Sequence, residues 1–365
     1  MLKNTVGIAA FFDEYAENGI YKAVAAALPF DMVGTSSTVT GARGQTGEYS
    51  LAVMMLTSDD VSFVSRSIAT ENKSPKEITA ALEKIYGEFL AQDKPKVVFS
   101  YMAPQAYFSG DDFMDATDKI TQELLLFGSL SWNTDGVSEK NFVAFNDNVS
   151  PYLMSFIAVY GNFEPHFKAT TSLDMNALIK EAAIISSAEG PVLKAVNNIP
   201  AFDYLQKIGL VGANAKDLTQ LCAVPAIIIY ENGRRVARAV VQTVPGDPKS
   251  LLVTGNTPIG AKISFALMDA DKTLRSAVEA TQQFEREKIK NSLNYSCAVR
   301  SWSLGTKFLA ECEAFSSYHE RLGKTGISAN YMLCYSGGEI CPVPDANGKL
   351  VNCLHSYTLI SCVFD

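Results

Sequence analysis

Features that would place this chain in a membrane or in the secretory pathway are missing. No uninterrupted apolar run comes near the roughly 18 residues that a membrane-spanning helix needs, and the best runs, such as Val224 to Tyr230, have the length of a strand. The amino terminus has no basic segment followed by a long apolar core, which is the pattern of a secretion signal. We therefore expect a cytoplasmic protein without a membrane partner.

Concentrated positive charge is also missing. The net charge is −8, and Lys and Arg form no cluster beyond the pair Arg234-Arg235 and a mixed-charge face at 285–288. Phosphate backbones and anionic lipid surfaces are bound through clustered basic residues. The sequence therefore predicts no nucleic-acid partner and argues again against a membrane surface.

Signals for metals and cofactors are few. The chain has three histidines, and its seven cysteines show no C-x2-C pair; six, eleven and eight residues separate the last four. An odd number of cysteines without an export signal argues against a disulfide framework, so packed thiols are expected. Neither a phosphate-binding G-x-x-x-x-G-K-[ST] motif nor G-x-G-x-x-G is present. We expect no metal and no cofactor.

The length of 365 residues exceeds what one hydrophobic core usually fills, so two domains are expected. A polar stretch over 169–198 looks irregular and separates two patterned halves. The predicted domains are therefore 1–198 and 199–365.

Apolar spacing and capping residues predict helices over 17–28, 74–92, 111–126, 199–205, 273–291 and 304–322. Extended apolar runs predict strands over 31–36, 49–56, 96–102, 141–148, 152–162, 225–230, 236–244, 261–268, 293–299, 327–335 and 354–364. Hairpins mixed with helical crossovers indicate an α+β fold, with two domains of mixed or largely antiparallel sheets flanked by helices.

Three local patterns are specific enough to test. Ser74, Pro75 and Glu77 form the start of a capped helix. The dipeptide Asn232-Gly233 predicts a tight hairpin turn between strands 225–230 and 236–244. The short link between 141–148 and 152–162 indicates an antiparallel pair of strands.

Several short motifs occur in a fixed order along the chain: Val33-Gly34-Thr35-Ser36-Ser37-Thr38, Phe127-Gly128-Ser129, Ser296-Cys297-Ala298-Val299-Arg300, Gly338-Glu339-Ile340 and His355-Ser356-Tyr357-Thr358. This order resembles that of the FIST_N and FIST_C domains, over nearly the whole chain. One departure is Ser356, where the family commonly has asparagine.

The resemblance implies a sensory module of intracellular signal transduction for small ligands, with amino acids or similar polar metabolites suspected. Such domains are often fused to output domains. Nothing in this sequence is similar to an output domain, so we expect the signal to pass to a separate output protein.

Polar residues at the ends of apolar strands suggest a binding site in the second half. Arg300 is expected to end strand 293–299, Glu339 to lie in a glycine turn with Gly338, and His355 to start the last strand. If these strands are neighbours, the three side chains converge on an amino-acid-like ligand, with Cys297 and Thr358 nearby. The alternative is that Arg300 and Glu339 form an ion pair that locks two strands.

The glycine-rich stretch from Gly34 to Gly47 suggests a second, weaker site. A loop with many backbone donors can bind an anion, and Gly34, Ser36 and Thr38 would contact it. A plain mobile connection is the alternative.

Two other functions stay open. A hydrolase or transferase would use Cys297 as the nucleophile and His355 as its base. A protein-interaction scaffold would need no small ligand. The binding interpretation assigns no catalytic residue.

Overall fold

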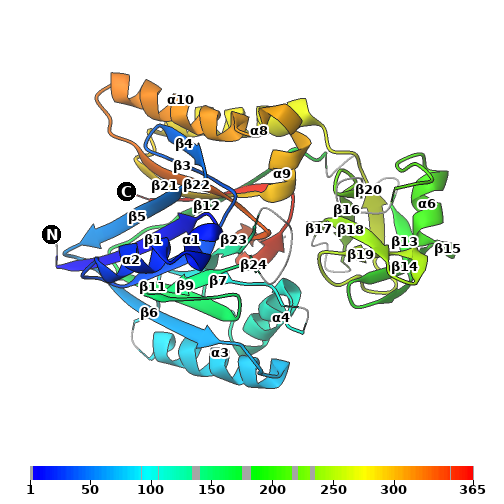
Figure 1. Ribbon diagram of the computed structural model, residues 1–365, viewed down its shortest axis with the longest axis horizontal. Helices are drawn as coiled ribbons and strands as arrows, with labels where there is room; N and C mark the ends of the chain where they lie inside the picture. Colours follow the sequence, from blue (N-terminus) through cyan, green and yellow to red (C-terminus); the bar gives the residue numbers. More distant parts are fainter. Residues whose placement is uncertain are drawn as a thin grey trace.

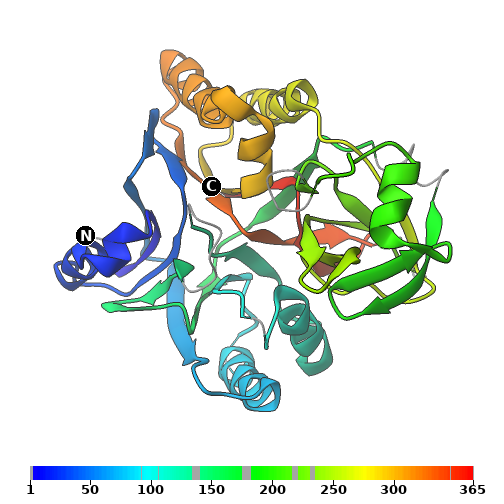
Figure 2. The ribbon, with the colours of Figure 1, turned by 45° about the vertical axis from the view of Figure 1, so that its right-hand side comes forward.

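The computed structural model describes residues 3–91, 93–105, 107–133, 140–174, 182–215, 221–230, 235–345 and 347–364. The N-terminal and C-terminal parts of the chain together form a larger body, and residues 183–265 form a smaller unit beside it (Figure 1). Figure 2 shows the smaller unit in green and yellow next to the red C-terminal strands. In the described part of the chain, the larger body contains three sheets.

The first sheet has the order β10 (Asn148–Ser150), β9 (Val143–Phe145), β2 (Met32–Ser36), β1 (Asn4–Phe11) and β5 (Leu51–Ser58). β1 and β2 are parallel and are connected by α1 (Glu14–Glu17) and α2 (Ile20–Ala26). The sequence predicted one helix over 17–28. Gly19 divides this region because its φ of +79° is left-handed and cannot continue a right-handed helix.

The second sheet has the order β24 (Leu350–His355), β23 (Gly338–Pro344), β8 (Leu126–Leu130), β7 (Val97–Met102), β11 (Leu153–Gly161) and β6 (Val61–Ala69). Two helices, α3 (Pro75–Leu90) and α4 (Gly110–Ile120), pack their apolar faces against it. The predicted cap of α3 is confirmed, since the Ser74 backbone N–H donates to Glu77 Oε2 at 2.8 Å. The helix predicted over 111–126 ends earlier, because Thr121 is extended.

The third sheet has the order β12 (His166–Thr171), β25 (Thr358–Phe364), β21 (Asn291–Cys297), β22 (Asn330–Ser336), β3 (Val39–Ala42) and β4 (Gln45–Glu48). The long helices α8 (Ala270–Glu287) and α10 (Ala310–Lys324) pack against each other and cover one of its faces. The short helices α9 (Ala298–Ser303) and η2 (Gly305–Lys307) follow β21.

The three sheets pack around a shared apolar core. It combines residues such as Ile8 of the first sheet, Phe99 of the second and Leu293 of the third. The hydroxyl groups of Tyr101 and Tyr295 lie 2.6 Å apart and connect the second and third sheets inside this core. The larger body is therefore one packed unit.

The smaller unit is a strongly curved sheet in the order β17 (Arg235–Arg238), β16 (Ala226–Ile229), β20 (Lys262–Phe265), β13 (Ala183–Glu189), β14 (Val192–Val196), β19 (Asp247–Val253) and β18 (Val240–Val244). β15 (Ile199–Pro200) pairs with β14, and α6 (Ala201–Lys207) packs on the unit's own apolar core. The first and last strands of the order are separated in sequence by Ala239 alone. The sheet therefore folds back on itself.

Several local predictions need correction. The stretch 169–198, expected to be irregular, contains the second half of β12 and all of β13 and β14. The strands over 141–148 and 152–162 do not pair with each other: β9 pairs with β10, and β11 pairs with β6 and β7. The sequence pattern did not predict the turn at 146–147, which joins β9 and β10 into a small hairpin.

The hairpin of the smaller unit agrees with the prediction, because β16 and β17 are antiparallel with Ile229 opposite Arg235. The predicted turn at Asn232-Gly233 lies outside the described residues.

The expected α+β class is confirmed, since mixed and antiparallel sheets are flanked by helices. Strands from both sides of residue 198 share sheets in the larger body: β3 pairs with β22, β12 with β25, and β8 with β23. The division into 1–198 and 199–365 stays a sequence-level prediction.

None of the helices in the described part of the chain combines the length and apolar character that crossing a bilayer requires.

Candidate functional site

The carboxyl ends of three parallel strand pairs meet at one place in the larger body. The pairs are β1 with β2, β7 with β8, and β21 with β22. Just after β8, the backbone N–H of Trp132 donates to the carbonyl of Ser36 at 3.1 Å, and just after β22 that of Gly337 donates to Leu130 at 3.0 Å. Ligands of open α/β sheets bind outside the carboxyl ends of parallel strands.

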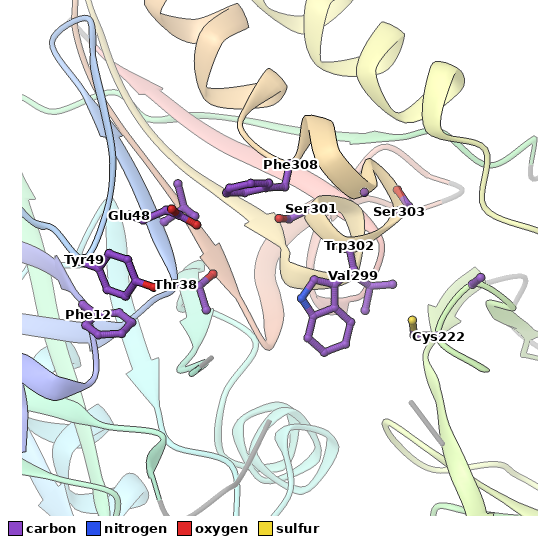
Figure 3. A pocket seen from close by; sticks show the side chains of 13 residues that line it. Phe12, Thr38, Glu48, Tyr49, Cys222, Val299, Ser301, Trp302, Ser303 and Phe308 are labelled. Carbon is purple, nitrogen blue, oxygen red and sulfur yellow. The ribbon is translucent and has the colours of Figure 1, made fainter. Parts of the chain in front are cut away.

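A cavity of about 540 Å³ lies at this meeting point (Figure 3). Segments following β1, β2 and β21 contribute to it, together with the residues that precede β16 in the smaller unit. The lining residues are Phe12, Thr38, Val39, Glu48, Tyr49, Cys222, Ala223, Val299, Ser301, Trp302, Ser303, Gly305 and Phe308. The volume falls in the range of about 300–1,000 Å³ that small-molecule sites occupy.

Aromatic side chains form much of the wall. Tyr49 is 63% exposed and Trp302 is 37% exposed, which is unusual for such large apolar groups. The ring of Phe12 supports Tyr49 edge-on at 4.7 Å, and the Tyr15 hydroxyl donates to the carbonyl of Tyr49. The ring of Trp132 supports Trp302 at 5.5 Å. Both exposed rings are therefore held in place from behind.

Polar groups in the lining are few. Glu48 is the one carboxylate, and no Lys, Arg or His is among the described residues of the lining. The hydroxyls of Thr38 and Ser301 make no hydrogen bond with any described residue, whereas Ser303 Oγ donates to the carbonyl of Arg300 at 2.7 Å. The described lining thus offers one negative charge and three hydroxyls without a hydrogen bond to described residues, those of Thr38, Tyr49 and Ser301.

Arg300 lies beneath this cavity. The predicted strand ends at Cys297, so Arg300 belongs to α9 instead of ending a strand. Its guanidinium is fully buried and pairs with the equally buried Glu311 of α10, with Nη2 2.6 Å from Oε1. Nη2 also donates to Ser276 Oγ of α8 at 2.9 Å, so Arg300 ties α8, α9 and α10 together.

Glu339 is also fully buried, in β23 and not in a turn. Burial raises the pKa of its carboxyl well above the ordinary value of 4.5, and the smaller opposing effects of Ser336, Arg300 and Cys297 do not offset it. Ser336 Oγ donates a hydrogen bond to Oε1 of Glu339 at 2.7 Å. Oε2 of Glu339 makes no hydrogen bond of standard geometry with the described residues. Burial therefore favours the protonated form of Glu339.

The neighbours of Glu339 include part of the predicted set. Cys297 and the backbone amide of Thr358 lie close to its carboxyl, and Gly338 precedes it in β23. His355 ends β24 instead of starting the last strand, and its Nε2 lies 3.2 Å from the carbonyl of Cys341. The structure thus groups Arg300, Glu339, Cys297 and Thr358 in the interior. His355 lies directly opposite Glu339 in the antiparallel pair of β23 and β24.

These residues do not form the mouth of the cavity, because none of them belongs to its lining. Their role as ligand contacts stays a prediction. Burial, together with the nearby Glu339, raises the pKa of the Cys297 thiol well above its ordinary value. A thiol in that state is a poor nucleophile, which speaks against the cysteine-dependent enzyme.

The glycine-rich stretch from Gly34 to Gly47 is not a loop. It covers the end of β2, all of β3 and part of β4. A Cβ at Gly34 would lie 3.0 Å from the Phe11 ring, and Ser36 Oγ accepts a hydrogen bond from the Phe142 amide, so both residues have structural roles. Of this set, only Thr38 reaches the cavity.

Sequence reasoning missed the aromatic lining and Glu48. An exposed aromatic residue cannot be told from a core residue in a single sequence. The sequence carries one weak signal, since Tyr49 directly follows Gly47-Glu48. In the structure the φ of Tyr49 is +48°, which is rare for such a residue.

Comparison with protein families gives two adjoining matches. The FIST N domain matches residues 6–199, and the FIST C domain matches residues 201–342. The chain belongs to the FIST family, as the motifs indicated. FIST domains are sensory domains of signal transduction proteins. No curated protein matches the chain.

Proposed function

We propose that this protein is a sensory module that binds a small molecule in the cavity between α9, the ends of β1 and β2, and the segment before β16. The lining supports this proposal most directly. Exposed aromatic rings held from behind, a few hydroxyls without hydrogen bonds and one carboxylate are the elements of a small-molecule site, in which apolar walls give affinity and a few polar groups give orientation.

The cavity wall is also connected to the smaller unit by direct contacts. Cys222, in its wall, stands at the entrance to the smaller unit, and its carbonyl accepts a hydrogen bond from the Tyr357 hydroxyl at 2.8 Å. A second contact is the buried ion pair between Arg238 of β17 and Asp111 of α4, at 2.6 Å. A ligand that touches both α9 and Cys222 would change how the smaller unit sits on the larger body.

The sensed molecule would be a small metabolite, and a separate protein would read the change in the smaller unit. In this proposal, Arg300 and Glu339 support the site from below by fixing α9 and the β23 region, and Thr38 contacts the ligand.

A thermal-shift screen of the full chain tests the proposal. The panel would contain amino acids, amines, carboxylates and nucleosides, and the matched variant would be Thr38→Phe, which fills the cavity without removing a hydrogen bond. A ligand at a hundred times its dissociation constant adds about 2.7 kcal/mol of stability. We expect at least one compound to stabilise the wild-type chain and not Thr38→Phe. Equal shifts in both chains, or none in either, would contradict it.

A further inference from the structure

The geometry of the cavity points to a specific class of ligand: a primary amine on an apolar or aromatic body, without a carboxylate. This inference rests on the proposed function, since it names what the same cavity binds. We propose that Glu48 recognises the ammonium group and that the aromatic wall holds the body.

The sign of the charge in the cavity is the first argument. Glu48 is the last residue of β4 and lies opposite Val39, which also lines the cavity. Glu48 is exposed, and its carboxylate makes no hydrogen bond or ion pair with any described residue. An uncommitted carboxylate next to a cavity whose described lining residues include no cationic side chain favours a positively charged ligand.

The aromatic wall gives the second argument. Figure 3 shows Phe12, Tyr49 and Glu48 on one side of the cavity, with Trp302 on the other side. Ammonium groups are attracted to the faces of Trp and Tyr rings, most strongly when water is excluded. The same rings can also pack against the apolar body of the ligand. A cation therefore gains from both the carboxylate and the rings.

The helix beside the cavity gives a third argument of the same sign. Ser301, Trp302 and Ser303 form the last turn of α9, which ends at Ser303. The carbonyl end of a helix carries partial negative charge. The hydroxyls of Thr38, Tyr49 and Ser301 can accept hydrogen bonds from an ammonium group, which has three donors.

An α-amino acid fits this lining less well than an amine. Its carboxylate would enter a cavity whose charged group is Glu48, and Arg300, the nearest predicted partner for a carboxylate, is buried and paired with Glu311. A carboxylate without a partner loses its hydration without compensation. We therefore expect the cavity to discriminate between an amine and the corresponding amino acid.

The test compares four probes that share one aromatic body: phenethylamine, phenylethanol, phenylpropionate and phenylalanine. Calorimetric titration of the full chain would be repeated on Glu48→Gln and on Glu83→Gln. Glu83 is an exposed residue of α3, so this control removes the same charge away from the cavity. Phenethylamine should bind most tightly, and Glu48→Gln should weaken it by about threefold to fivefold. Phenylethanol binding should change less than about twofold in Glu48→Gln, and Glu83→Gln should change neither ligand by more than that.

Three results would overturn the inference. Phenylpropionate or phenylalanine could bind as tightly as phenethylamine, or Glu48→Gln could leave phenethylamine binding unchanged, or none of the four probes could bind. In each case the proposed function is tested separately, by the thermal-shift screen of the compound panel on the wild-type chain and on Thr38→Phe. A compound of another class whose binding is blocked by Thr38→Phe would preserve the sensory cavity and refute the amine.

Discussion

The hydroxyl of Tyr357 donates a hydrogen bond to the carbonyl of Cys222 at 2.8 Å. Tyr357 lies in the two-residue link between β24 and β25, with a left-handed φ of +59°, and its own carbonyl faces Arg300 Nη1 at 3.5 Å. One residue thus contacts the wall of the cavity and the buried cluster beneath it. This contact gives the proposed sensor a physical connection between its ligand and its interior.

Removing that connection should loosen the smaller unit. Tyr357→Phe deletes the hydrogen bond and should lower the free energy of unfolding by about 1 kcal/mol. Hydrogen exchange of residues 221–230 should become faster. The matched control is Tyr107→Phe, which deletes a bond to the carbonyl of Thr70 in the larger body. Unchanged exchange in 221–230 of Tyr357→Phe would show that the bond does not hold this segment.

The pair of Arg300 and Glu311 should be costly to break from one side. Arg300→Met leaves the Glu311 carboxyl buried without its cation, and such losses cost about 3–5 kcal/mol. Urea unfolding measures the loss. The double variant Arg300→Met with Glu311→Leu should be less destabilised than Arg300→Met alone, because no buried charge remains.

An exposed pair provides the comparison. Arg66 and Glu88 lie at 2.8 Å with 45% and 39% of their side chains exposed. Arg66→Met should lower the free energy of unfolding far less than Arg300→Met does, since water screens the exposed pair. A loss as large as that of Arg300→Met would contradict the role assigned to burial.

Glu339 should make stability fall as the pH rises. Its pKa is raised in the folded state, so the folded chain keeps a proton that the unfolded chain releases above about 4.5. The stabilising contribution of Glu339 is complete below a pH of about 4.5. As the pH rises from there toward the pKa of the folded state, the contribution is lost at up to about 1.4 kcal/mol per pH unit. Glu339→Gln keeps an acceptor for Ser336 and removes the titration.

Urea unfolding midpoints of the wild-type chain and of Glu339→Gln, measured across this pH range, check how stability changes with pH. The wild-type chain should lose stability relative to Glu339→Gln with each step upward in pH. Glu77→Gln is a control of opposite sign, because hydrogen bonds from Ser74 lower the pKa of Glu77. Parallel curves for wild type and Glu339→Gln would mean that Glu339 is ionised in the fold.

Gly255 should be intolerant of a side chain. A Cβ there would lie 2.3 Å from Asp111 Oδ2 and 2.6 Å from Arg238 Nε, and its φ of +142° is unfavourable for other residues. Gly255→Ala should therefore disturb the ion pair between the smaller unit and α4 and lower the melting temperature. Gly212→Ala, with open space around it, should not. Equal melting temperatures for the two variants would refute this.

Local rules predicted the local structure well. The start of α3 follows from Ser74, Pro75 and Glu77 because capping depends on residues three positions apart. The pairing of β3 with β22 joins residues about three hundred positions apart, and no local pattern carries that information. Sheets shared between distant segments were therefore beyond the sequence.

The candidate site was predicted only in part. Arg300 and Glu339 do lie close together, as their strand-end positions suggested, but tertiary packing buried them. The cavity wall comes from segments that are distant in sequence, including parts of β3, β4 and α9, and exposure of Tyr49 and Trp302 is a property of the assembled fold. Charge and hydrophobicity along the chain could not locate it.

The most direct test of the central claim is the emission of Trp302. The chain has two tryptophans, so Trp132→Phe leaves Trp302 as the reporter. The indole N–H of Trp132 makes no hydrogen bond with the described residues, so this variant removes no hydrogen bond. If the cavity is the sensory site, titrating this variant with the compounds of the panel will give a saturable change in emission for at least one of them. Adding Thr38→Phe will abolish that change. Emission that stays constant for every compound, or that changes equally with Thr38→Phe, would contradict the assignment of the cavity.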